Sequence, residues 1–221
     1  MKLLYENPLE KQSDVDSFIK EGELKVSFAN GKMRLENMLD EALGQKSNFL
    51  FWCPKKFPSD IQIEWDFMPL SDSGLAMMFF CANGKNGIDL FDKSLHKRTG
   101  EYQQYHSSDI NAFHASYFRR KLADERIFHT CNLRKSCGFH LVAQGADPIP
   151  SAIDAQKSPS MYHITIKKEQ SNITFSINNL TIYTFIDDGK TYGNLLNGGY
   201  IGFRQMAPLV AEYSSLKVFA L

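Results

Sequence analysis

The sequence lacks an excess of charge of either sign and any long apolar run, and each absence excludes a class of protein. Its 221 residues contain 25 Lys and Arg and 25 Asp and Glu, whereas nucleic-acid-binding domains are usually basic. No apolar run approaches the roughly 20 residues that a membrane-spanning helix needs. We therefore expect neither a nucleic acid nor a membrane among its partners.

The amino terminus and the cysteines predict a cytoplasmic protein. Glu6 and Pro8 interrupt the first residues, so the apolar segment of a secretory signal is not predicted. The four cysteines are Cys53, Cys81, Cys131 and Cys137. They form no C-x-x-C pair, and no cluster of His and Cys has the spacing of a zinc site. We expect reduced, mostly buried thiols and neither a metal nor another cofactor.

Apolar and polar residues alternate with a period of two along much of the chain, which is typical of strands with one buried face. Residues 61–67, 162–166 and 173–177 are clear examples. Asn30-Gly31 separates two such runs and predicts a tight hairpin. Further strands are expected near residues 49–53, 75–82, 87–91, 112–119, 127–134, 138–143, 181–186, 199–205 and 213–220.

Helical signals are few. A capped turn is expected near Ser13, and a strand is favoured over a helix across residues 109–121. Residues 145–160 contain three prolines, and we expect them to form a surface loop. About a dozen strands joined by short turns predict an all-β fold of two packed antiparallel sheets. Because no break in composition divides the chain, we expect a single domain over residues 1–221.

Groups able to hold a sugar are concentrated on the polar faces of the predicted strands. Aromatic rings stack on the apolar faces of sugars, while amides, carboxylates and guanidinium groups bind the hydroxyls. On a curved sheet such residues line a groove; otherwise they form a solvated surface with weak ion pairs. The candidates are Trp52, Glu64, Asp66, Tyr117, Arg119, Asn132, Arg134, His140 and Arg204.

Glu64 and Asp66 are the candidates for glycoside hydrolysis. Residues i and i+2 of a strand point the same way, roughly 6.6 Å apart, and two carboxylates can act as acid and nucleophile if burial raises one pKa. Sandwich-fold glucanases of the laminarinase type carry a third acid shortly afterwards, where this sequence has Met68 and Pro69. The alternative is that both carboxylates bind Arg side chains or solvent.

A second set of residues suits β-elimination from a uronic acid. That reaction needs a cation or amide to neutralise the substrate carboxylate, and a Tyr or His to move the proton of the neighbouring carbon. The first task is predicted for Arg119, Asn132, Arg134, Arg204 and Gln205. The second is predicted for Tyr105, His106, Tyr117 and His140. The sequence alone does not bring these groups together.

Several segments resemble the YesU-like family of bacterial proteins, among them YHSSDINAFHASYFRR at 105–120, NLRKSCGF at 132–139, GYIGFRQM at 199–206 and AEYSSLKV at 211–218. The resemblance spans nearly the whole chain. It implies a concanavalin A-like or galectin-like jelly-roll sandwich and a genomic setting of rhamnogalacturonan breakdown. It implies no established reaction, and a shared fold does not choose between lectin, hydrolase and lyase.

The leading hypothesis is a cytoplasmic, carbohydrate-active protein that binds and processes oligosaccharides of type I rhamnogalacturonan, a pectin, in a concave sheet groove. Trp52 would stack on the sugar, and the arginines would bind a galacturonate carboxylate. The other substrate-binding residues expected are Tyr105, His106, Asn132 and Gln205. The alternative is a non-catalytic, lectin-like carbohydrate-binding protein. A third interpretation is a domain without ligand whose exposed aromatic residues are buried in a homodimer.

Overall fold

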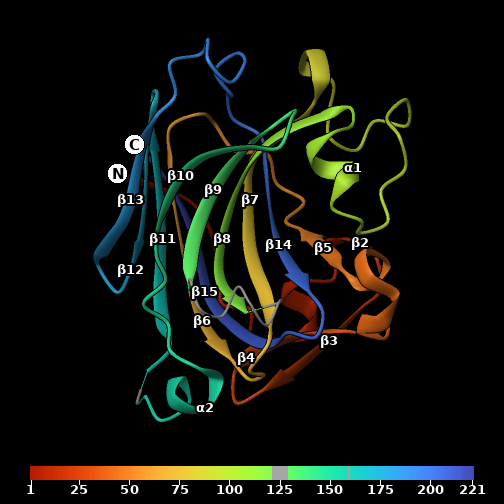
Figure 1. Cartoon of the computed structure of the whole chain (residues 1–221), viewed down its shortest axis with the longest axis vertical. Coiled ribbons are helices and arrows are strands. Elements are labelled where there is room, and N and C mark those ends of the chain that lie inside the picture. The colour runs from red at the N-terminus through yellow and green to blue at the C-terminus, as the bar shows by residue number, and fades with distance from the viewer. Residues whose placement is uncertain (121–128, 159) are drawn as a thin grey trace.

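The computed structural model describes residues 1–120, 129–158 and 160–221. In it the chain folds into two antiparallel sheets (Figure 1). Within these ranges the eight-stranded sheet has the order β13 (Leu180–Ile186), β12 (Asn172–Ile177), β11 (Tyr162–Glu169), β6 (Ile61–Pro69), β15 (Val210–Ala220), β4 (Lys32–Asn37) and β3 (Leu24–Ala29), with β1 (Lys2–Asn7) paired to β15. The seven-stranded sheet has the order β10 (His140–Ala146), β9 (Thr130–Ser136), β8 (Ile110–Arg120), β7 (Gly74–Gly84), β14 (Tyr200–Met206), β5 (Phe49–Trp52) and β2 (Ile19–Glu21). The all-β, two-sheet fold predicted from the sequence is confirmed.

Helical segments in the described ranges are short and lie in the connections between strands. They are the 3-10 segments η1 (Gln12–Asp14), η2 (Glu41–Ser47) and η3 (Lys85–Gly87) and the single turns α1 (Gln103–His106) and α2 (Ala152–Ala155). None of these described helices has the length and apolar character needed to cross a membrane.

Alternation along the strands builds the core between the two sheets. On β6, the apolar residues Ile61, Ile63, Trp65 and Phe67 are buried, and the residues between them are partly exposed up to Asp66. Trp65 Nε1 donates a hydrogen bond to the hydroxyl of Tyr117 on the opposite sheet (3.1 Å). Burying one such large apolar side chain contributes about 1.5–3 kcal/mol. The two sheets are therefore held together by these inward-facing rows.

The hairpin predicted at Asn30-Gly31 is confirmed. It joins β3 to β4, with Ala29 paired to Lys32. Asn30 has a φ of 52° and Gly31 a φ of 69°, and a tight two-residue turn of this hand requires positive φ at both positions. Gly and Asn are the residues that adopt this conformation most readily.

Some local predictions differ from the structure. Residues 87–91 were expected to be a strand, but η3 and turns occupy this region, where Gly84 N donates to the carbonyl of Ile88 (3.0 Å) and closes the chain on itself. Strands β1 and β2 were not predicted, because neither alternates clearly. The strand expected at 127–134 begins at Thr130; residues 127 and 128 lie outside the described residues. The long loop at 145–160 contains the helical turn α2.

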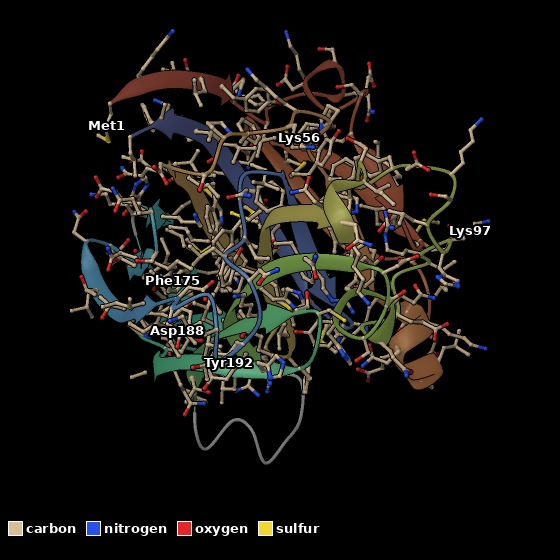
Figure 2. The ribbon with its side chains drawn as sticks, turned by 90° about the horizontal axis from the view of Figure 1, so that it is seen from above. Met1, Lys56, Lys97, Phe175, Asp188 and Tyr192 are labelled. Atoms are coloured by element: carbon tan, nitrogen blue, oxygen red, sulfur yellow. The ribbon has the colours of Figure 1, made fainter. Side chains whose placement is uncertain are left out.

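Residues 88–107, here called the covering segment, lie on the outer face of the seven-stranded sheet. Its residues Leu90, Tyr102 and Tyr105 are buried in a second apolar cluster, together with Trp52 of β5 and Phe79 of β7. Figure 1 shows α1, which belongs to this segment, beside the sheet. In Figure 2, Lys97 of the covering segment lies on the opposite side of the molecule from Asp188 and Tyr192, which follow β13. The covering segment thus fills part of the predicted groove.

Candidate functional site

The outer face of the seven-stranded sheet is hollowed where the covering segment ends. The cavity, here called the β7–β9 pocket, has a volume of about 350 Å³, near the lower end of the range of about 300–1,000 Å³ found for small-molecule sites. Its lining residues are Gln45, Leu75, Met77, Tyr102, His114, Ser116, Arg119, Asn132, Arg134, Phe139 and Met206.

The register of three neighbouring strands builds the floor of the pocket. Met77 of β7 pairs with Ser116 of β8, which pairs with Asn132 of β9. Two residues further along, and so on the same face, His114 of β8 pairs with Arg134 of β9. Directly paired residues on one face of an antiparallel sheet have neighbouring side chains. The floor therefore changes from apolar at β7 to polar and cationic at β9.

Two arginines supply the positive charge of the pocket. Arg119 Nη1 donates to Thr130 Oγ1 (2.6 Å), and the amide oxygen of Asn132, when turned toward Arg119, accepts from the same nitrogen (3.2 Å). Arg134 Nη1 donates to the carbonyl of Phe139 (2.9 Å), and its guanidinium carbon lies 3.7 Å from the centre of the Phe139 ring. These contacts hold both guanidinium groups at the pocket.

Among the described residues that line the pocket, none carries a carboxylate. A third guanidinium, that of Arg204, is fully buried nearby and lies 5.0 Å from the centre of the Tyr102 ring. The pocket therefore favours an anionic ligand, because a carboxylate can form charge-assisted hydrogen bonds with guanidinium groups.

Tyr102 and His114 form the wall between the pocket and the covered part of the sheet. The Tyr102 hydroxyl lies 3.0 Å from His114 Nδ1. Burial raises the pKa of Tyr102 to about 12, although the charge of Arg204 acts in the opposite direction. Burial, assisted by the positive charge of Arg204, lowers the pKa of His114 well below its usual value. Both side chains are therefore uncharged at neutral pH.

The structure brings together three of the residues predicted to bind substrate: Arg119, Asn132 and Arg134 line one pocket. The sequence placed Asn132 and Arg134 on the same face of a strand as Thr130, and the alternation of β9 agrees, because Cys131 and Leu133 are buried in the core. His106 lies beside the pocket, with its ring centre 4.5 Å from that of Phe139.

Two predicted residues, Trp52 and Arg204, lie beneath the covering segment, and a third, Tyr105, belongs to it. Trp52 is fully buried against the edges of Phe79 and Phe91, so it presents no stacking surface for a sugar. Tyr105 is also fully buried. Arg204 Nη1 donates to the carbonyl of Gly100 (2.7 Å). The prediction that these side chains share an outer sheet face is correct for Trp52 and Arg204, but the chain's own apolar residues fill that part of the face.

Tyr117 and Gln205 point into the core between the sheets, not toward the pocket. The Tyr117 hydroxyl accepts from Trp65, and Gln205 Nε2 donates to the hydroxyl of Tyr213 (2.8 Å). The prediction that Tyr117 and Arg119 share a face is wrong because Phe118, between them, has a φ of 48°. One such residue interrupts the two-residue alternation of a strand, so Tyr117 faces inward while Arg119 lines the pocket.

Glu64 and Asp66 lie on the other sheet, on the outer face of β6, and do not line the pocket. Both face His163 of β11: Asp66 Oδ1 lies 2.9 Å from His163 Nδ1, and Glu64 Oε2 lies 3.9 Å from Nε2. His140 is exposed at the start of β10, with its ring centre 5.4 Å from that of Tyr192. Neither group joins the pocket arginines.

Replacing Asp66 with asparagine should lower the pKa of His163. The hydrogen bond that His163 donates to the Asp66 carboxylate raises this pKa above its ordinary value of about 6.5, despite partial burial. Because the folded-state pKa is raised, the interaction stabilises the fold below about pH 6.5, and its contribution disappears as the pH rises through the folded-state value. Asp66→Asn should therefore lower the Tm at acidic pH and leave it nearly unchanged at alkaline pH.

A proton NMR titration of His163 is the direct measurement for Asp66→Asn. The midpoint should move to lower pH in the variant. The His106 signal serves as the internal control and should not change, because His106 lies beside the β7–β9 pocket, on the outer face of the other sheet. An unchanged His163 midpoint would show that Asp66 does not set its pKa.

Most of the pocket wall was not predicted from the sequence, including Gln45, Tyr102, His114, Ser116 and Phe139. A signal was available for His114 and Ser116, which alternate with the apolar Phe113, Ala115 and Tyr117 and so belong to the polar face of β8. Gln45 and Tyr102 lie in connections. Strand periodicity carries no information about where such connections fold back.

Comparison with known proteins gives one family. The model of a domain of unknown function, DUF1961, matches residues 2–218. The uncharacterized protein YesU of Bacillus subtilis (strain 168) is 53% identical over 215 residues, which make up 97% of this chain and 94% of that protein. A crystal structure of a protein of unknown function with a galectin-like fold from Bacillus subtilis has a TM-score of 0.94 and 50% identity, covering 100% of this chain and 96% of that chain.

More distant structures share the architecture. The carbohydrate-binding module CBM66 from Bacillus subtilis has a TM-score of 0.55 and 12% identity, covering 90% of this chain and 92% of that chain. A prokaryotic β-1,3-1,4-glucanase (lichenase) derived from a mouse hindgut metagenome has a TM-score of 0.61 and 10% identity, covering 100% of both chains. The galectin-like jelly-roll sandwich predicted from the sequence is confirmed.

Proposed function

The chain belongs to the DUF1961 family, and from the chemistry of its pocket we propose that it binds a carboxylate-bearing saccharide in the β7–β9 pocket. The observation that carries the proposal is that Arg119, Asn132 and Arg134 converge on one cavity whose described lining has no carboxylate. A galacturonate residue combines a carboxylate, which arginines bind well, with an apolar ring face that can pack on aromatic side chains.

The distant fold neighbours support a saccharide as the ligand. One is a carbohydrate-binding module and another is a glucanase, and fold similarity alone does not decide between binding and catalysis. We assign the ligand to oligosaccharides of type I rhamnogalacturonan, because their galacturonate units supply the negative charge that the pocket favours. Processing of the bound oligosaccharide is the first interpretation, and a lectin-like protein that binds without reaction is the second.

The proposal also includes a single-domain organisation and a cytoplasmic location. We treat residues 1–221 as one domain, supported by an apolar core cluster to which both sheets contribute. A cytoplasmic location is supported by four free thiols, three of them buried, since unpaired cysteines are usual in a reducing compartment.

Arg134→Ala should weaken the binding of galacturonate oligosaccharides at least about tenfold, because a hydrogen bond to a charged group contributes about 1.5–3 kcal/mol. The Tm should change little, because Arg134 is partly exposed and lies on the outer face of the sheet. Isothermal titration calorimetry measures the affinity, and a thermal melt measures the stability.

Lys167→Ala is the matched control for Arg134→Ala. It also removes one positive charge, but Lys167 lies on β11 of the other sheet, paired with the exposed Glu169 (2.9 Å). The control should bind like the parent. If Arg134→Ala binds as tightly as the parent, Arg134 is not part of the site. If both variants lose the same affinity, the loss comes from the change in overall charge and not from a contact of Arg134.

A further inference from the structure

A chain of hydrogen bonds runs from the pocket wall into β9. The Tyr102 hydroxyl lies 3.0 Å from His114 Nδ1, and His114 Nε2 lies 3.0 Å from Ser136 Oγ. Ser136 Oγ also donates to the carbonyl of Ala112 (3.2 Å). Because the Ser136 proton is used in that bond, Oγ accepts from His114, which fixes the proton of the neutral imidazole on Nε2. His114 Nδ1 is therefore an acceptor, and the Tyr102 hydroxyl donates to it.

Packing holds the imidazole in this orientation. The His114 ring stacks on Phe79, with ring centres 4.0 Å apart and an interplanar angle of 21°. His114 is almost fully buried, yet it and Tyr102 both line the pocket. A tyrosine hydroxyl at a pocket wall with a fixed proton acceptor behind it is an arrangement suited to proton transfer.

We infer that Tyr102 and His114 are the proton-transfer pair of a β-elimination that cleaves a uronate glycoside in the β7–β9 pocket. The inference rests on the proposed function, because it takes the same acidic saccharide as its substrate. Retaining or inverting hydrolysis normally needs two carboxylates beside the scissile bond. The described lining of the pocket offers none, whereas elimination uses the types of group that are present.

The reaction balances without any co-reactant. The C5–H bond of the uronate breaks, and its proton moves to the Tyr102 oxygen while the phenolic proton of Tyr102 moves to His114 Nδ1. The electron pair of the C5–H bond forms the C4=C5 double bond as the C4–O bond breaks. Tyr102 then donates its proton to the leaving oxygen and recovers one from His114 Nδ1. The products are an unsaturated uronate and a saccharide with a free hydroxyl.

Three guanidinium groups stabilise the charge that develops in this step. Arg119 and Arg134 are placed to bind the substrate carboxylate, where negative charge accumulates as the C5 proton leaves. Arg204 acts from beneath Tyr102. Its Nη1 donates to Gly100, whereas its Nε and Nη2 have no hydrogen-bond partner within the described residues. Its positive charge favours negative charge on the Tyr102 oxygen during the transfer, and it disfavours the protonated form of His114, so that the proton held at Nδ1 returns readily to Tyr102.

Tyr102→Phe tests the inference, because it removes the hydroxyl and keeps the ring that packs against Arg204 and Phe139. The assay follows the ultraviolet absorbance of the C4=C5 double bond with oligogalacturonate and rhamnogalacturonan oligosaccharides as substrates. We expect the variant to form the unsaturated product about 100-fold or more slowly than the parent, in line with the loss of a general acid–base group. Affinity for the oligosaccharides, measured by calorimetry, should stay within about threefold.

Tyr105→Phe is the matched control. Tyr105 lies in the same segment and its hydroxyl accepts from Gly100 N (3.2 Å), but it does not line the pocket. The control should retain the parent rate. A parent protein that binds the oligosaccharides and forms no unsaturated product overturns the inference and leaves a lectin-like protein. A Tyr102→Phe variant as active as the parent also overturns it, and a parent that binds none of the oligosaccharides overturns the proposed function itself.

Discussion

Lys135→Ala is expected to lower the free energy of unfolding by about 3–5 kcal/mol, the range for breaking a buried ion pair by removing one partner. The side chains of Lys135 and Asp187 are 1% and 2% exposed, and Lys135 Nζ lies 2.7 Å from Asp187 Oδ2. Lys135 also donates to the carbonyl of Gly193 (2.9 Å). It thus joins β9 to the loop that follows β13. Without it, the Asp187 carboxylate stays buried with no cation beside it.

Chemical denaturation with urea measures this loss. Lys157→Ala is the control, because the Lys157–Asp154 pair is exposed, and an exposed ion pair contributes about 0–1 kcal/mol. The double variant Lys135→Met, Asp187→Leu should recover much of the stability, since apolar residues of similar volume often replace a buried pair without loss. A Lys135→Ala variant as stable as Lys157→Ala would mean that the pair is hydrated in solution.

Gly100→Ala should be the second most damaging change, with a loss of about 2–5 kcal/mol from backbone strain and overpacking together. Gly100 has a φ of +100°, and a Cβ there would overlap the carbonyl oxygen of Asn48. Because neither backbone segment can yield cheaply, the covering segment must move away from the sheet. Tyr102 would move with it, so that saccharide affinity should fall together with stability.

Gly193→Ala separates the two causes. Gly193 also has a positive φ, of +83°, but nothing lies within 4 Å of the added Cβ. This variant should lose only the contribution of backbone strain, about 1–2 kcal/mol, and should bind saccharides like the parent. Urea midpoints of the two variants, with calorimetric titrations, give the comparison. Equal losses in both would exclude the steric overlap at Asn48 as a cause.

Local periodicity was sufficient to predict the fold class and much of the polar face of β9. Thr130, Asn132 and Arg134 alternate with the buried Cys131 and Leu133, so their common direction could be read without coordinates. On β8, periodicity predicts the wrong face for Tyr117, because the alternation holds only along an unbroken strand. The positive φ at Phe118 is a backbone feature that its neighbours do not signal, and it places Tyr117 and Arg119 on opposite faces of the sheet.

Periodicity also does not assign a polar face to a sheet. Glu64 and Asp66 alternate with the core residues of β6 as predicted, but β6 belongs to the sheet opposite the pocket. The pairing of strands far apart in sequence decides this, and it depends on the whole packing arrangement. The covering segment is a similar case, because the burial of Trp52 beneath it follows from long-range contacts.

The covering segment has a consequence for the way in which a polymer can be engaged. Tyr102 stands between the pocket over β7–β9 and the apolar residues packed over β5 and β14. If the proposed saccharide runs across the strands, its end would lie against Tyr102 and would not continue along the full width of the sheet. The number of binding sites in a pectin sample would then depend on how many molecules it contains, not on how long they are.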